Sequence, residues 1–148
     1  MTGGKHQTQW AGQFGVAHEL TRRGYLVTFT MGNAPTTDLL CKSPQGRTFA
    51  VQVKSLKSKN YFLYQESLLT PNPDLCVIFA LVPDDLTQAP QYFVLNNGQF
   101  LAVVEEENGR TKQREKERGR PYKPYSPGII YRTLNRDEFR GAWHNLPR

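Results

Sequence analysis

The sequence predicts an α/β fold with a central mixed β-sheet flanked by helices. Three observations support this class. Residues 8–23 carry apolar side chains at helical spacing, residues 75–82 form an apolar run without polar alternation, and short β-branched or aromatic runs lie around them. The 148 residues, with a formal charge of +6, are enough for one domain over 1–148 with its own core.

The first predicted helix spans residues 8–23, and Gly24 suits the position just past its end. Its apolar side chains recur on one stripe that we expect to pack against the sheet: Trp10, Phe14, Ala17 and Leu20. A strand is predicted at residues 25–30, because this stretch is rich in β-branched and aromatic residues. Gly, Asn and Pro then predict a loop at residues 31–37.

A β-hairpin is predicted next, with strands at residues 38–43 and 48–55 joined by a Pro-Gln-Gly turn. Side chains alternate across a strand, so the second strand has two distinct faces. Its apolar set belongs in the core: Phe49, Val51 and Val53. The opposite face carries the remaining set: Ala50, Gln52 and Lys54.

The register of this hairpin decides which polar groups meet. If Ser43 lies across from Thr48, Asp38 is level with Gln52 or Val53, and a shift by one residue changes little. We therefore expect a carboxylate, an amide and an ammonium at one end of the hairpin. As an isolated pair, Asp and Lys on adjacent strands contribute about 0–1 kcal/mol. Alternatively, carboxylate, amide and backbone oxygens form a ligand set that Mg²⁺ accepts.

The second half of the chain predicts another hairpin and further helices. Residues 75–82 and 91–95 form the strands of this hairpin, and Asn96 or Asn97 caps a helix running to about Glu107. The segment between the two hairpins is ambiguous between strand and short helix.

A last strand at residues 128–134 and a closing helix complete the predicted fold. Asn135 and Glu138 resemble a capping box at the start of that helix. Its apolar face would carry three residues: Phe139, Trp143 and Leu146.

Residues 110–128 have almost no aliphatic side chains and are rich in charge, Gly and Pro, so we expect a long, mobile basic loop. Seven basic and two acidic residues lie between Arg110 and Lys123. The loop is either a solvated charged surface or one that binds a phosphate backbone. The DNA-binding candidates, with two lysines after the first hairpin, are Lys57, Lys59, Arg110, Lys112, Arg114, Lys116, Arg118, Arg120 and Lys123.

Cys41 and Cys76 lie in apolar strand-like runs and form no CxxC pair, so we expect buried free thiols in a reducing compartment. The N-terminal residues lack the apolar core of a signal peptide, and the longest apolar run is too short to span a membrane. We therefore expect a soluble, cytoplasmic protein with no membrane partner.

Three stretches, GQFGVAHELTRRGY, APTTDLL and VQVKS, together resemble the PD-(D/E)XK nuclease superfamily, which has the restriction-endonuclease-like fold. The pattern is similar to the variant with QxK in place of ExK, which includes a bacterial group I intron homing endonuclease and has Holliday junction resolvases as neighbours. The resemblance covers residues 10–56. It implies a restriction-endonuclease-like core and an intracellular protein of bacterial or phage-like type.

The resemblance implies a DNA endonuclease that depends on Mg²⁺ or Mn²⁺. Asp38 would be the principal metal-binding carboxylate, Gln52 would stand where Asp or Glu is usual, and the Val53 carbonyl would complete the ligand set. Lys54 would position the attacking water as the catalytic lysine. Gln13 occupies the accessory position of the first helix, which is acidic in such proteins. Cleavage of both strands of a DNA duplex needs two active sites, which implies a homodimer or homotetramer.

Gln13 leaves three interpretations open: weak metal binding with slow cleavage, a binding-only relative, or an engineered Glu→Gln change. Glu19 projects roughly 120° away from Gln13 around the helix, so it is a poor substitute. Beside the endonuclease we weigh a non-catalytic DNA-binding module, a Holliday junction resolvase-like enzyme, and a protein-interaction domain with a degenerate site.

Overall fold

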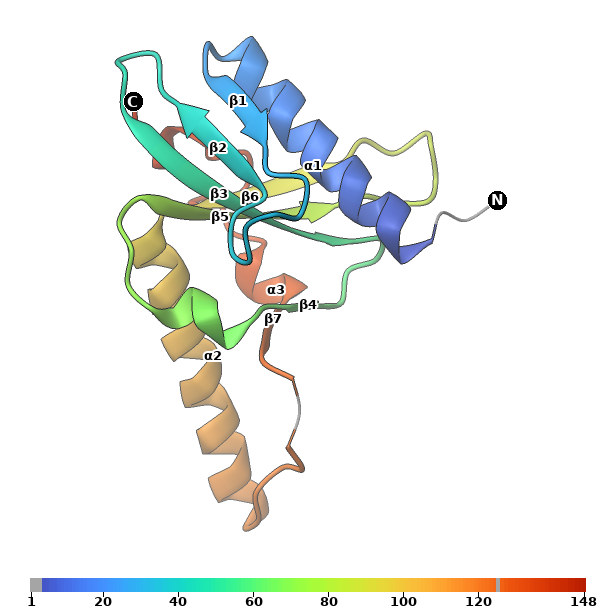
Figure 1. Ribbon diagram of the computed structural model, residues 1–148. Coiled ribbons are helices and arrows are strands. Elements are labelled where there is room, and N and C mark those ends of the chain that lie inside the picture. The colour runs from blue at the N-terminus through green and yellow to red at the C-terminus, as the bar shows by residue number, and fades with distance from the viewer. Residues whose placement is uncertain (1–3, 125) are drawn as a thin grey trace.

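The computed structural model describes residues 4–124 and 126–148, in which a central sheet lies between α1 and α2 (Figure 1). The elements in chain order are α1 (Lys5–Arg22), β1 (Leu26–Phe29), β2 (Leu39–Lys42), β3 (Thr48–Leu56), β4 (Tyr61–Leu63), η1 (Glu66–Leu69), β5 (Leu75–Leu81), β6 (Gln91–Leu95), α2 (Asn97–Arg118), β7 (Gly128–Ile130), α3 (Tyr131–Leu134) and η2 (Trp143–Asn145). The predicted α/β class is confirmed.

The central sheet has the strand order β1-β2-β3-β5-β6. β3 and β5 run parallel, whereas the other neighbouring pairs of this sheet are antiparallel, so the sheet is mixed as predicted. A parallel pair needs a crossover connection, and the ambiguous segment between β3 and β5 supplies it through β4 and η1. β4 pairs with β7 in a separate antiparallel ribbon.

Two apolar clusters lie on opposite faces of the sheet, and β5 contributes to both. Val77 and Phe79 belong to the cluster that contains the buried residues of α2, whereas Cys76 and Ile78 belong to the cluster beneath α1. All residues of β5 are buried. The predicted strand with two buried faces is therefore confirmed, and its lack of polar alternation has a direct cause.

α1 begins at Lys5, earlier than predicted, and lies directly on β3. A Cβ at Gly12 would be 1.9 Å from Ser55 Oγ, so only glycine permits this approach. Phe14 does not join the core as predicted: it is 57% exposed and stacks on Trp10 at 5.5 Å between ring centroids. The buried side of the helix is formed by Gly12, Gln13, Val16, Ala17 and Leu20.

The first predicted hairpin is confirmed as β2 and β3, with its register shifted by one residue. Lys42 rather than Ser43 pairs with Thr48. Ser43 instead closes the turn, because its N–H donates to Arg47 O at 2.8 Å and its Oγ accepts from Arg47 N at 2.9 Å. The apolar face of β3 lies beneath α1 as expected: Phe49, Val51 and Val53.

α2 continues to Arg118, so the loop predicted over residues 110–128 is wrong for residues 110–118. Apart from Thr111, its charged stretch consists of Lys, Arg, Glu and Gln, which are strong helix formers, and Glu106 pairs with Arg110 along the helix. Gly119 ends the helix in the left-handed region at φ 73°. Residue 125 of the predicted loop lies outside the described residues. No helix within the described residues is long and apolar enough to cross a membrane.

The C-terminal region also differs from its prediction. β7 is followed directly by the short α3, and the stretch after it forms turns and η2 rather than a closing helix. Gly141 has φ 59°, which interrupts a helix, and the Asn145 side chain donates to Val94 O and Glu138 O at 2.8 and 2.9 Å. Phe139 and Leu146 are nevertheless buried.

Cys41 and Cys76 are buried and free, as predicted. Burial raises the pKa of each thiol to about 12. Because the thiolate is the reactive form, neither cysteine is a nucleophile near neutral pH.

Candidate active site

Asp38 lies immediately before β2, and hydrogen bonds hold both its backbone and its side chain. Its N–H donates to Val51 O at 3.0 Å, and its backbone oxygen accepts from Thr30 N at 3.0 Å. Its side-chain Oδ2 accepts from Val53 N at 2.8 Å. These bonds orient the carboxylate towards β3, level with Gln52 and Val53.

The main-chain groups of Val53 face Asp38 because of the alternation along β3. Ala50 N donates to Asp74 O beside β5, so the odd-numbered residues direct their N–H and C=O groups to the other neighbour, β2. β2 begins only at Leu39, so no backbone carbonyl of β2 lies opposite Val53. The Asp38 side-chain oxygen accepts the Val53 N–H in its place. The Val53 carbonyl therefore projects towards the same side as the carboxylate.

Gln52 is 5% exposed, and its Oε1 has no hydrogen-bond partner among the residues that the structure describes. A buried unpaired carbonyl oxygen costs about 1–3 kcal/mol, so a ligand at this oxygen would offset a real penalty. Asp38, Gln52 and Val53 offer carboxylate, amide and backbone oxygens, the types that Mg²⁺ accepts. The donor set therefore fits a hard divalent cation in type, with one negative charge.

Lys54 completes the cluster, and its Nζ donates to Gln65 Oε1 at 2.6 Å. Burial lowers the pKa of the Lys54 ammonium, an effect that the Asp38 carboxylate partly opposes. Burial likewise raises the pKa of Asp38, against the Val53 N–H and the Lys54 charge. Opposed shifts of neighbouring groups are typical of functional sites. Gln65 was missed from the sequence, because its segment has no clear periodicity.

Gln13 is buried on α1, next to the Gly12–Ser55 contact with the strand of Lys54. Within the described residues it forms no hydrogen bond with Asp38, Gln52 or Lys54. Glu19 pairs with Arg22 and Arg23 and is thus committed elsewhere. No group of three or more His, Cys, Asp or Glu side chains suited to a metal occurs in the described part of the chain. Asp38 is therefore the sole carboxylate of the predicted set.

The predicted DNA-binding residues occupy different environments. Lys57 pairs with Asp84 at 3.5 Å, and Lys59 lies over the Tyr131 ring at 5.5 Å. Arg110 is held by Glu106 and Glu107 at 3.3 and 3.2 Å, so its main contacts are within the protein. These three cations belong to the body of the fold rather than to the projecting half of α2.

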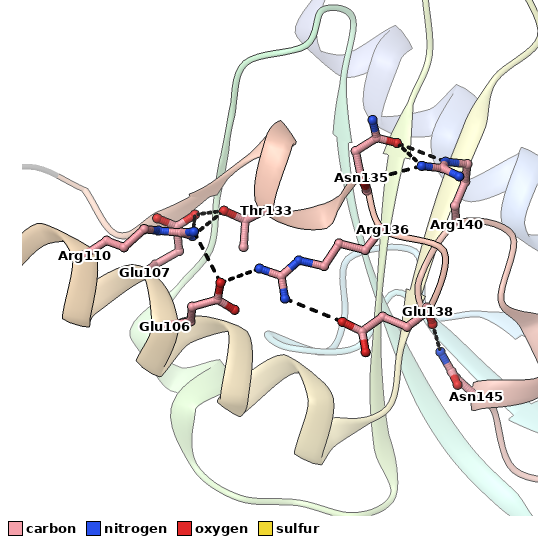
Figure 2. A network of polar contacts seen from close by, with 9 residues as sticks. All are labelled: Glu106, Glu107, Arg110, Thr133, Asn135, Arg136, Glu138, Arg140 and Asn145. Atoms are coloured by element: carbon pink, nitrogen blue, oxygen red, sulfur yellow. Dashed lines mark hydrogen bonds and ion pairs between the residues drawn. The ribbon is translucent and has the colours of Figure 1, made fainter.

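A polar network attaches the base of the projecting half of α2 to α3 and the turn after it (Figure 2). Glu107 Oε1 accepts from Thr133 Oγ1 at 2.6 Å and from Ile130 N at 3.2 Å, and Arg110 donates to Thr133 Oγ1. Arg136 contacts Glu106 on the adjacent turn of α2. Arg110 therefore helps to hold α2, a role that the sequence did not indicate.

Beyond this network, α2 carries cations on two sides. At 100° per residue, Arg114 and Arg118 fall on one side and Lys112 and Lys116 on the other. A cleft of about 980 Å³ lies on the first side, between α2, the returning residues 120–123 and the β4–β7 ribbon. Its basic lining is Arg114, Arg118, Arg120 and Lys123.

Comparison of the chain with protein-family models, curated proteins and solved structures finds no match. The fold defines the chain as an α/β protein with a mixed five-stranded sheet. The resemblance of residues 10–56 to a nuclease superfamily stays a prediction, which the arrangement around Asp38 makes testable.

Proposed function

We propose that this protein is a metal-dependent DNA endonuclease with a restriction-endonuclease-like core of the QxK type. One observation carries the proposal: the Asp38 carboxylate accepts from Val53 N between Gln52, whose buried Oε1 is unpaired, and Lys54, whose ammonium interacts with the carboxylate. An ion pair between Asp38 and Lys54 on the protein surface would not account for the buried, unpaired Gln52 Oε1. Side-chain alternation places Gln52 and Lys54 on one face of β3, and the bond to Val53 N brings Asp38, from the residue before β2, to the same level.

Asp38, Gln52 and the Val53 carbonyl would hold Mg²⁺ or Mn²⁺. When bound, such an ion polarises a phosphate and lowers the pKa of a coordinated water. Lys54 lies beside Asp38, and its lowered pKa increases the neutral fraction that can accept a proton from the attacking water. Gln65 orients the Lys54 Nζ through its hydrogen bond. The water oxygen forms a bond to phosphorus as the bond to the leaving sugar oxygen breaks.

Gln13 limits this chemistry in the proposal. Its amide is neutral, so it adds no charge to the single carboxylate of Asp38. We therefore expect weaker metal binding and slower cleavage than a set with two carboxylates would give. The DNA partner would be double-stranded, and a homodimer or homotetramer would present one site to each strand.

The direct test is cleavage of supercoiled plasmid with Mg²⁺ or Mn²⁺. Asp38→Ala and Lys54→Ala should each lower the rate by at least about a hundredfold, whereas Lys42→Ala, an exposed lysine on β2, should leave it unchanged. Equal rates for the wild type and Asp38→Ala would refute the catalytic proposal. Circular dichroism of each variant checks that the fold is retained.

A non-catalytic DNA-binding module is the second candidate, favoured by the single carboxylate and by the cations on both sides of α2. It predicts DNA binding that weakens with salt, together with no metal-dependent cleavage by the wild type. Cleavage of a four-way junction is measured beside that of a linear duplex. Faster cleavage of the junction would indicate a Holliday junction resolvase-like enzyme. If the protein shows no salt-dependent affinity for DNA, a protein-interaction domain is the remaining interpretation.

A further inference from the structure

The cleft beside α2 is a separate feature from the Asp38 cluster. α2 projects away from the sheet, and the chain returns alongside it towards β7 (Figure 1). Tyr61 and Tyr64 of the β4 region line the cleft at one end, and Tyr122 lies on the returning segment. The Tyr61 hydroxyl donates to Ser126 O at 3.2 Å, and Tyr64 N donates to Pro127 O at 3.1 Å. These two bonds join the end of the returning segment, at Ser126 and Pro127, to the β4 region.

The charge inside the cleft is positive. Arg114, Arg120 and Lys123 form no ion pair within the described part of the chain, although they line the same space. Two carboxylates also line it, Glu66 and Glu107. Glu107 is already occupied by Arg110, Thr133 Oγ1 and Ile130 N, so it offers little free negative charge. An anionic ligand therefore suits the cleft.

Aromatic and guanidinium planes accompany this charge. The Arg118 guanidinium lies over the Tyr122 ring at 4.3 Å from its centroid, and Tyr122 is 39% exposed. Tyr122 is also held in place, because its N–H donates to Glu115 Oε1 at 2.8 Å. A cationic groove with an exposed, fixed ring is the combination that binds the phosphates and base faces of an unpaired strand.

The size of the cleft favours an unpaired strand over a duplex. Its volume of about 980 Å³ is near the upper end of the range for small-ligand pockets, which suits a few nucleotides. In a duplex the base faces are stacked inside and cannot reach Tyr122, whereas the bases of a single strand can stack on side chains.

The cleft and the Asp38 cluster meet at one short segment. Gln65 accepts the hydrogen bond from Lys54, and its neighbours Tyr64 and Glu66 line the cleft. A strand held in the cleft would therefore leave it close to Lys54. We propose that the cleft binds a single-stranded nucleic acid segment, so that a substrate with an unpaired strand beside a duplex is favoured. Only this last step, the link to a substrate, rests on the proposed nuclease function.

Binding is tested by fluorescence anisotropy with EDTA present, so that cleavage plays no part. The probe is a labelled oligodeoxyuridine of about 12 nucleotides, with oligouridine, which differs from it only in the sugar, and the matching duplex as comparisons. The wild type should bind a single strand more tightly than the duplex, and the tighter of the two single strands identifies the preferred sugar. Tighter binding of the duplex would overturn the proposal.

Two pairs of variants separate the cleft from general electrostatics. Arg114→Ala/Arg118→Ala should weaken single-strand binding at least about tenfold, whereas Lys112→Ala/Lys116→Ala removes the same charge from the other side and should change it less than about threefold. Tyr122→Ala should weaken it about fivefold or more, and Tyr122→Phe should retain it. Equal losses of single-strand affinity in both double variants, or an unchanged affinity in Tyr122→Ala, would refute binding in the cleft.

The outcome is independent of catalysis. Asp38→Asn should bind the single strand as the wild type does, even where it abolishes cleavage. Loss of cleft binding with cleavage retained would overturn only the single-strand proposal, and the reverse result would overturn only the nuclease.

Discussion

The carboxylate of Asp38 accepts a hydrogen bond from the backbone N–H of Val53, with 2.8 Å between Oδ2 and N. This bond joins the residue before β2 to β3 and fixes the carboxylate beside Gln52 and Lys54. Burial nevertheless raises the pKa of Asp38, so the charged form is held in the fold at a net cost. The first prediction follows from this cost.

Asp38→Asn should stabilise the protein near neutral pH. The folded-state pKa of Asp38 lies above its ordinary value of 3.8, so the folded chain favours the neutral group, and stability falls as pH rises through the raised pKa. Asparagine is neutral throughout and avoids that loss. Thermal melts should show a higher Tm for the variant at about pH 7 and a vanishing difference below the ordinary aspartate pKa. A lower Tm for Asp38→Asn at neutral pH would contradict the assignment.

Gln52→Leu should separate stability from activity. Leucine removes the buried amide whose Oε1 is unpaired, so the free energy of unfolding should stay unchanged or rise by about 1 kcal/mol. Metal-dependent cleavage should be lost, because a ligand oxygen has gone. Urea denaturation and plasmid cleavage measure the two effects. A loss of stability above about 2 kcal/mol would show that Gln52 is bonded in the folded protein.

Gln13→Glu should raise the cleavage rate by about tenfold to a hundredfold at limiting Mg²⁺. A carboxylate at this buried position adds the negative charge that the donor set lacks. The same variant should lower Tm in the absence of metal, because a buried charge is then uncompensated. Glu19→Gln, which alters a paired carboxylate on the same helix, serves as the control. No increase in rate would place Gln13 outside the site.

Thr133→Val should destabilise the attachment of α2. Thr133 is buried, and its hydroxyl donates to Glu107 and accepts from Arg110, so the isosteric valine removes both bonds. We expect a loss of about 1–2 kcal/mol in urea denaturation. Thr87→Val removes a hydroxyl bonded to Asp85 on an exposed loop and should cost less than about 0.5 kcal/mol. Similar costs for both variants would argue against the network.

Gly12→Ala and Gly109→Ala should have opposite effects although both glycines are helical. At Gly12 the new Cβ would be 1.9 Å from Ser55 Oγ and 3.0 Å from Ser55 Cβ, so the helix must shift at a cost of about 1–3 kcal/mol. At Gly109 nothing lies within 4 Å, so alanine should stabilise α2 by about 0.5–1 kcal/mol. Differential scanning calorimetry measures both, and a stabilising Gly12→Ala would refute the close contact.

Much of the candidate site was accessible from the sequence because it is local. Alternation along β3 places Gln52 and Lys54 on one face, and a short turn brings Asp38 to their level even when the register shifts by one residue. The turn itself was the source of that shift, since Ser43 bonds with Arg47 instead of pairing with Thr48. Gln65 could not be predicted, because it reaches Lys54 through the crossover rather than through strand periodicity.

By itself, the sequence determined the α/β class, the two faces of β3 and the burial of β5, because side-chain alternation and apolar runs act over a few residues. The tertiary structure decided the rest. The charged stretch at 110–118 has few apolar side chains to mark a buried face, and the contact that attaches the base of this part of α2 comes from Thr133, far along the chain. The cleft between α2 and the returning segment likewise exists only once these distant residues meet, since its walls depend on long-range contacts.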